Sequence, residues 1–216
     1  IVGKAIHDGG LTELASGSVT GGYRPGLWVV DTANNSAMAP FAAVQLHGVY
    51  NGNPVNELDN ILAGWTIKVI GSVSRFDGET QFNPINNNIG STANGDAIEI
   101  ISTSGAAPAP AVVNMGDLND QNRENQLETG EQWEGAYIEM HNLTVTAVNF
   151  FSSGSRVSFD VADANGNVMN VSDRFIAQKL PSHAAVNAAS PQTTGLFTVP
   201  PVGAQFDTLR GIVIHS

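Results

Sequence analysis

Short stretches of alternating apolar residues, bounded by glycine, asparagine, aspartate or proline, recur along almost the whole chain. They occupy residues 27–31, 43–49, 65–73, 97–101, 136–140, 143–148, 156–161, 168–171 and 211–214. Alternation with a period of two places apolar side chains on one face of a β-strand. Helical spacing occurs in two short places, 56–62 and 174–180. The sequence therefore predicts an all-β fold.

Two dipeptides predict where strands turn back on themselves. Asp77-Gly78 separates the alternating residues 65–75 from 79–83, and Asn165-Gly166 separates 156–161 from 167–172. Aspartate or asparagine followed by glycine can adopt positive φ at both central positions, as a type I′ turn requires. We expect a tight hairpin at each dipeptide.

The strand pattern occurs twice, which predicts two tandem domains. In each half, strands are followed by a short helix and then by a further strand, the layout of a small Greek-key barrel of the OB-fold type. The first predicted barrel covers residues 1–103 and the second covers 133–216. Residues 104–132 combine a Pro/Ala stretch with an acidic run and form the predicted linker.

The second predicted barrel departs from this layout. It stops at its fourth strand and contains a long irregular loop at 181–205. We therefore expect an open barrel that lacks its closing strand, and truncation of a longer chain is the alternative explanation. An open barrel leaves backbone N–H and C=O groups unpaired along its edges.

Composition excludes several classes of protein. Nine basic against 20 acidic residues give a net charge of −11, which removes the attraction to phosphate behind non-specific nucleic-acid binding. The absence of cysteine excludes disulfides, thiolate metal sites and a cysteine nucleophile. No run approaches the ~18 consecutive apolar residues of a membrane span. A hydrophobic share of 42% is enough for a folded core.

Three stretches resemble a known kind of domain. Residues 26–31, 64–82 and 133–146 are similar to the OB-fold-like domains of large secreted bacterial extracellular nucleases and related cell-surface proteins. The resemblance implies an extracellular or cell-surface β module that stands beside a catalytic domain. The matching residues are structural ones, so the resemblance transfers no catalytic residue to this chain.

The pattern of reactive residues predicts a protein without catalytic activity. No histidine is paired as His-x-x-x-His or His-Glu, and no serine lies in a Gly-x-Ser-x-Gly motif. The five histidines are His7, His47, His141, His183 and His215. A catalytic pair of carboxylates of the glycosidase type remains an alternative, because a sequence does not reveal which carboxylates lie close together in space. Glu131 and Glu134 flank Trp133, but the resemblance implies that residues 133–135 are the entry to a strand.

Calcium is the one cofactor that the sequence suggests. Oxygen ligands at alternating spacing are the type that hard cations bind, although the glycine and glutamate of an EF-hand are missing from both segments concerned. The candidates are Asp163, Asn165, Asn167, Asp117, Asn119 and Asp120. In the alternative interpretation, 163–167 is a plain hairpin turn and 117–125 a solvated linker, and chelation leaves the fold intact.

An OB-fold also has an obvious alternative use, the binding of nucleic acid through stacked aromatic rings framed by basic residues. The residues that would form this face are Trp28, Phe41, Lys68, Arg75, Phe76 and Phe82. Against this use, basic residues are few and not clustered. Trp28 also alternates with aliphatic residues in a way that is typical of a core position.

The leading functional hypothesis is self-assembly. Residues 1–6 form an apolar strand without an obvious hairpin partner, and the second barrel lacks a strand, so one subunit could donate a strand to its neighbour. Such a head-to-tail contact builds a filament or surface layer. The predicted contact residues are Ile1, Val2, Ile6, Ile212 and Ile214. The alternative is an accessory module that binds nucleic acid or carbohydrate. Asn-x-Ser/Thr sequons occur at Asn34, Asn142 and Asn170.

Overall fold

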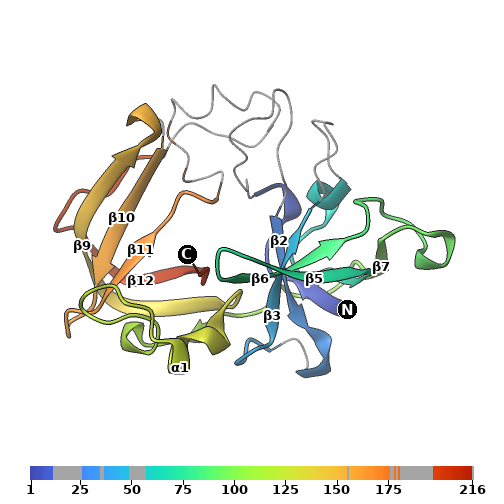
Figure 1. The fold of residues 1–216 in the computed structure, drawn as a ribbon, viewed down its shortest axis with the longest axis horizontal. Coiled ribbons are helices and arrows are strands. Elements are labelled where there is room, and N and C mark those ends of the chain that lie inside the picture. Colours follow the sequence, from blue (N-terminus) through green and yellow to red (C-terminus); the bar gives the residue numbers. More distant parts are fainter. Residues whose placement is uncertain are drawn as a thin grey trace.

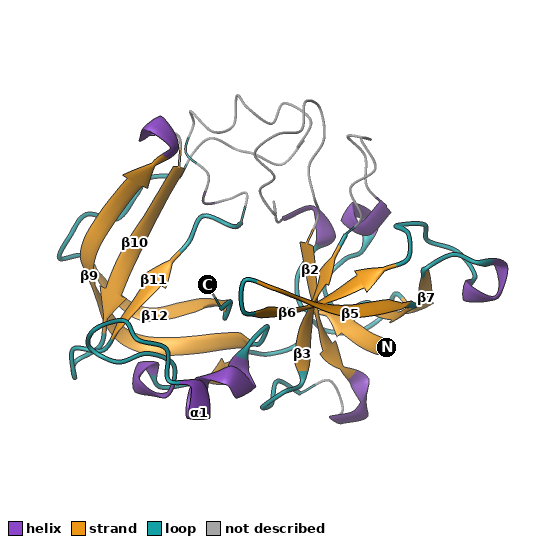
Figure 2. Ribbon diagram, viewed as in Figure 1, coloured by secondary structure: helices purple, strands orange, loops and turns teal. Residues whose placement is uncertain are grey.

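The computed structural model is mostly β, which confirms the predicted fold class (Figures 1 and 2). It describes residues 1–11, 26–34, 37–48, 57–154, 156–175, 178, 180 and 197–215. Strands form two sheets, one of seven strands and one of five. Among the described residues, no helix is both long and apolar enough to cross a lipid bilayer.

The first sheet has the strand order β5-β6-β3-β2-β1-β4-β7. Ile70 alone separates β4 from β5, so the two strands form one bent stretch of chain. Its first part, β4, pairs with β1, and its second part, β5, pairs with β6. Strands β3 and β6 run parallel. The bounds are β1 (Val2–Ala5), β2 (Gly26–Asp31), β3 (Ala43–His47), β4 (Thr66–Val69), β5 (Gly71–Phe76), β6 (Glu79–Pro84) and β7 (Ile98–Ser102).

Strand β1 corrects one prediction. Residues 1–6 were expected to form a free edge strand, but β1 is hydrogen-bonded to β2 on one side and to β4 on the other. Its partners are distant in sequence, which is why no hairpin signal accompanies it. Val2 therefore lies in the interior of the first sheet, where its backbone already has partners.

The second sheet is a curled half-barrel with the order β11-β10-β9-β12, and β8 pairs with β9 from outside this path. The long strand β9 bends at Asn142, whose φ of 55° puts two successive side chains on the outer surface and returns Leu143 to the core. The bounds are β8 (Ala111–Val112), β9 (Tyr137–Phe151), β10 (Arg156–Ala162), β11 (Val168–Val171) and β12 (Gln205–Ile212).

Helical turns are short, as the sequence predicts. The expected helix at 56–62 is the 3₁₀ turn η3, and the one at 174–180 lies largely outside the described residues. The turns are η1 (Gly9–Leu11), η2 (Thr32–Asn34), η3 (Glu57–Asn60), η4 (Thr92–Asn94), η5 (Met115–Asp117), α1 (Leu127–Gly130), η6 (Glu131–Trp133) and η7 (Ser152–Gly154).

Much of the predicted linker packs against the second sheet and contributes to its core. Val113, Met115 and Leu118 are buried in the same core cluster as Ile138 and Val145 of β9. The polar run after them is hydrogen-bonded to the β10–β11 loop, where the N–H of Val168 donates to the carbonyl of Asp120. The segment is therefore not a solvated connector, because it contributes apolar residues to a core.

One of the two predicted turns is confirmed. Asp77 and Gly78 have φ values of 51° and 87°, so both central positions of the β5–β6 turn are left-handed. At the other turn, Gly166 has positive φ but Asn165 does not, which excludes type I′. Asp163 is the reason, because its carboxylate accepts the N–H groups of Asn165 and Asn167 and closes a longer loop.

The two sheets meet along a small apolar junction. Strand β2 is buried on both faces, so Leu27 and Val29 enter the first core while Trp28 and Val30 face the second unit. Tyr137, Ile212 and Ile214 from the second unit pack against this outer face. The sheets thereby form two walls of one molecule (Figure 1).

Candidate functional site

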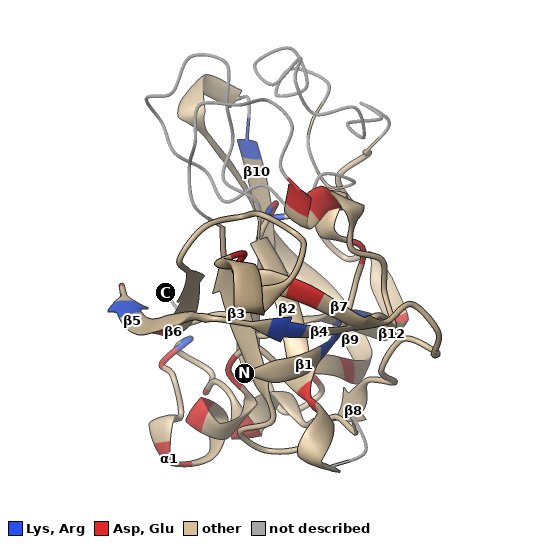
Figure 3. Ribbon diagram, turned by 90° about the vertical axis from the view of Figure 1, so that its right-hand side faces the viewer, with Lys and Arg blue, Asp and Glu red and all other residues tan. Residues whose placement is uncertain are grey.

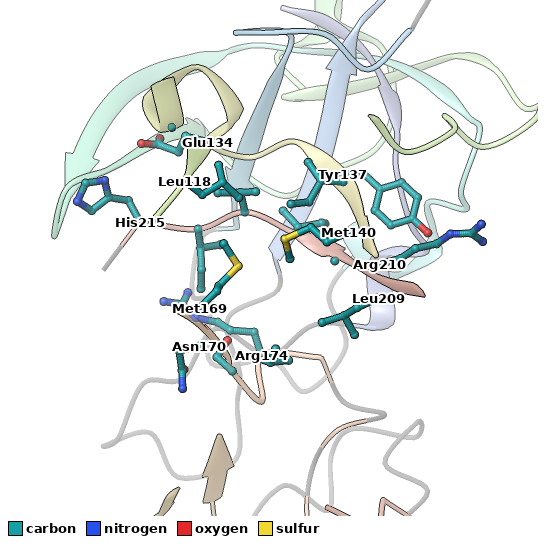
Figure 4. Close-up of a pocket in the computed structure, with 18 of the residues that line it drawn as sticks. Leu118, Glu134, Tyr137, Met140, Met169, Asn170, Arg174, Leu209, Arg210 and His215 are labelled. Atoms are coloured by element: carbon teal, nitrogen blue, oxygen red, sulfur yellow. The ribbon is translucent and has the colours of Figure 1, made fainter. Parts of the chain in front are cut away.

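A cavity of about 780 Å³ lies between β11 and β12 and extends to the junction of the two sheets. Leu118, Met140, Met169 and Leu209 project into it from the polar loop, β9, β11 and β12 (Figure 4). These apolar side chains belong to the core of the half-barrel or pack against it. The cavity is thus an opening into the core of the second sheet, in the size range of ligand pockets.

The strands on the two sides of the cavity have outer edges that no other described strand pairs with. Within the described ranges, β11 pairs with β10 alone and β12 with β9 alone. The loop at Asp120 bonds the N–H of Val168 at the start of the outer β11 edge. In an antiparallel pair the backbone N–H and C=O groups point toward and away from the partner strand at alternate residues. Asn170, two residues after Val168, therefore also points its backbone groups away from β10.

The wall of the cavity at the junction of the two sheets is aromatic, with His7 and Trp28 from the first sheet's part of the chain and Phe175 from the segment after β11. Trp28 lies 5.6 Å from His7 between ring centroids, and Phe175 lies 5.3 Å from His7 in an edge-to-face arrangement. Trp28 and Phe175 are stacked at 6.5 Å. Aromatic pairs at these separations add to the free energy gained by burial alone.

His7 is buried in this wall as a neutral imidazole. The N–H of Trp28 donates to its Nε2 at 3.3 Å, so Nδ1 carries the proton and donates to the carbonyl of Asp8 at 2.8 Å. Burial lowers the pKa of His7 from 6.5 to about 4, and the nearby Asp8 offsets only part of this effect.

We expect His7 to make the protein less stable in acid. The unfolded chain takes up the proton near pH 6.5 and the folded chain near pH 4, so stability is complete above pH 6.5 and is lost as the pH falls. The loss amounts to about 3 kcal/mol. Urea unfolding at pH 7 and pH 4 measures it, with His7→Gln as the control that removes this titration. Equal pH dependence in both proteins would contradict the assignment.

Charged residues gather at one end of the cavity. Glu131 and Glu134, in and after η6, lie with His215 beyond β12, and the β5–β6 hairpin reaches this cluster from the first sheet (Figures 1 and 4). Arg75 of the hairpin pairs with Glu131 at 3.1 Å. Burial raises the pKa of Glu79 on β6, and the charge of Arg174 opposes that rise.

The predicted calcium ligands are brought near one another but take part in hydrogen bonds within and between their own turns. Both oxygens of Asp163 accept bonds within its own turn. Asp120 accepts the N–H groups of two residues in its loop, and Asn119 donates to the carbonyl of Val168 on β11. Asp117 accepts from Asn114. Their arrangement is that of two turns packed on each other.

The predicted edge residues fall into two groups. Ile1 and Val2 lie at or in β1, which is paired on both sides, and Ile6 is buried at the junction. Ile212 ends β12, whose outer edge is unpaired in the described part of the chain, and Ile214 follows it. The free edge that was expected at the N-terminal strand is therefore found at β11 and β12.

The residues of the alternative nucleic-acid face are not brought together. Trp28 and Phe82 are buried in different clusters, while Phe41 and Phe76 are exposed. Lys68 is bonded to Thr92 and Glu99, and Arg75 to Glu131. Basic residues lie scattered over the described surface rather than along one groove (Figure 3).

Sequence reasoning missed most of the residues that line the cavity. Met140 and Met169 lie in predicted strands and Leu209 lies just before one, but no spacing in the sequence links β11 to β12. Glu131 and Glu134 were considered as a catalytic pair, and nothing in the sequence joins them to His215. Comparison of the chain with known protein families, with curated proteins and with solved structures found no match.

Proposed function

We propose that this protein is a non-catalytic structural or interaction protein of the extracellular space or cell surface, and that its half-barrel accepts a β-strand from a second copy. Repetition of that contact would build a filament or surface layer. The observation that carries the proposal is a cavity, with apolar side chains of the half-barrel core in its walls, between β11 and β12, whose outer edges pair with no further strand in the described part of the chain.

The order of pairing in the first sheet supports an OB-fold interpretation. An antiparallel meander of β1, β2 and β3 is followed by β6, parallel to β3, and the bent β4–β5 stretch connects β6 back to β1. This is the connectivity of a five-stranded Greek-key barrel in which β4 and β5 act as one strand.

The second sheet has counterparts for four of those five strands. Strands β9, β10, β11 and β12 pair as β1, β2, β3 and β4 do in the first sheet. In the described part of the chain, no strand takes the place of β6, beside β11 and β12. A strand from another molecule would fit there, parallel to β11 and antiparallel to β12, and would close the barrel.

The physical gain from such a strand has two parts. Its backbone would pair with N–H and C=O groups along both open edges, and its apolar side chains would cover Met140, Met169 and Leu209. A second copy is the occupant that we favour, since large apolar side chains are also exposed elsewhere on the described surface. Phe41, Val73 and Phe76 are each at least 70% exposed, an arrangement that suits a subunit in an assembly.

A lysine in the cavity tests the proposal. Met169→Lys places a charge where the donated strand would bury apolar groups, and we expect the polymers of the unchanged protein to give way to monomers. Val202→Lys is the control, because Val202 is 63% exposed and does not line the cavity. Sedimentation velocity and negative-stain microscopy measure the result. Wild-type monomers at high concentration would overturn the proposal, and salt-sensitive binding of single-stranded DNA would instead favour an accessory binding module.

A further inference from the structure

The charged end of the cavity contains three side chains that could bind one metal ion. Glu131, Glu134 and His215 each offer a ligand atom, and these atoms lie within 4.8 Å of one another. Glu131 is in η6, Glu134 follows that turn directly, and His215 lies in the segment after β12. Among the described residues, this is a group of three acidic or histidine side chains close enough together to share one metal ion.

Each carboxylate in the group has one oxygen engaged and one left over. Glu131 Oε1 accepts from Arg75 at 3.1 Å, and Glu134 Oε1 accepts the N–H of Thr80 at 2.5 Å. Glu134 Oε2 is buried and has no hydrogen-bond partner. Glu131 Oε2 lies 3.8 Å from His215 Nδ1, which is longer than a hydrogen bond. The spare oxygens are therefore available for a cation.

Glu79 is a further buried carboxylate beside this cluster. Its side chain is only 3% exposed, and its Oε1 atom is buried without a hydrogen-bond partner. Among charged groups the carboxylate interacts most strongly with Arg174, and it also interacts with Glu134 and His215. Burial of like charges and of an unsatisfied carboxylate oxygen is costly unless a cation offsets it.

We propose that Glu131, Glu134 and His215 form a binding site for a divalent transition-metal ion such as Zn²⁺. An imidazole with two carboxylates is a ligand set that Zn²⁺ accepts, whereas Ca²⁺ prefers oxygen ligands alone. Metal–ligand bonds of about 2.0–2.2 Å at tetrahedral angles place ligand atoms about 3.3–3.6 Å apart. The Glu131–His215 pair is at 3.8 Å and all three ligand atoms lie within 4.8 Å of one another, so metal binding would draw the three side chains closer together.

Neighbouring groups would orient the histidine. Asn125 Nδ2 lies 3.2 Å from His215 Nε2, and rotation of this amide by half a turn would let its oxygen accept a proton carried by Nε2. That bond would leave Nδ1 free for the metal, as outer partners of metal-bound histidines commonly do. Asn125 is therefore a positioning residue of the proposed site.

The metal would also hold the two sheets together. A Cβ atom at Gly78, in the β5–β6 turn, would lie 2.8 Å from His215 Cδ2, so the hairpin approaches the histidine as closely as glycine permits. Thr80 and Arg75 of the same hairpin bond the two glutamates. A bound ion would fix these contacts and resist separation of the two units.

Zinc titration of the full chain, freed of metal by a chelator, tests the proposal. We expect calorimetry to detect one Zn²⁺ per chain, and the melting temperature to rise by about 5–10 °C at a hundredfold excess over Kd. Ca²⁺ should give no such rise. His215→Ala and Glu134→Gln should both lose the shift, and the second keeps an acceptor for the Thr80 N–H.

His141→Ala is the matched control. His141 also lies beside a glutamate, with 3.1 Å between its Nε2 and Glu139 Oε1. No third ligand joins this pair among the described residues, so His141→Ala should leave the zinc shift unchanged. Absence of saturable binding would overturn the proposal. So would a full zinc shift in His215→Ala, an equal loss in His141→Ala, or a calcium shift as large as that of zinc.

Discussion

Replacement of Trp28 by alanine is expected to lower the free energy of unfolding by about 3–5 kcal/mol. The Trp28 side chain is 1% exposed and is packed between the first sheet and the second unit, against Ile6 and beside the rings of His7 and Phe175. The substitution would leave a cavity at this apolar junction between the two sheets, and the surrounding backbone cannot close it fully.

The same substitution separates the two interpretations of Trp28. A stacking residue for nucleic acid has to be exposed, and its removal changes binding while stability stays within about 0.5 kcal/mol. Phe76→Ala is the control, because Phe76 is 70% exposed on β5 and should fall in that range. Denaturant unfolding of the two variants measures the difference. A Trp28 variant as stable as Phe76→Ala would show that the junction does not depend on this ring.

Replacement of Arg156 by methionine is the second change with a large expected effect. Arg156, at the start of β10, donates from Nε to both carboxylate oxygens of Asp173, at 3.2 and 3.1 Å. Its guanidinium also lies 4.7 Å from the centroid of the Phe151 ring. Asp173 is 1% exposed, so the substitution would remove a two-pronged ion pair from a buried carboxylate. We expect a loss of about 3–5 kcal/mol.

The chain offers a matched control for this ion pair. Arg210 on β12 pairs with Glu139 on β9, but its side chain is 56% exposed, and Arg210→Met should cost about 1 kcal/mol or less. Arg156→Lys should give an intermediate loss, because lysine keeps the charge but not the two-pronged geometry. Thermal or urea unfolding distinguishes the variants. Equal losses at the two arginines would contradict a special role for the buried pair.

Local patterns predict local structure well in this protein. The alternating segments became strands, the run at 56–62 became a short helical turn, and Asp77-Gly78 formed the expected turn, because each depends on neighbours in sequence. The turn at Asn165 differs because a side chain two residues away, Asp163, bonds the backbone and selects a longer loop.

By itself, the sequence determined that the chain is β-rich and where most of its strands lie, since side-chain alternation and turn residues are properties of contiguous segments. The tertiary structure decided which strands pair. It placed β1 between β2 and β4, drew Val113 and Leu118 of the predicted linker into a core, and left β11 and β12 on either side of a cavity. It also brought Glu131 and Glu134 beside His215. Contacts between residues so far apart in the chain produce no regular spacing of residues in the sequence, because the length and sequence of the segments that connect them can vary.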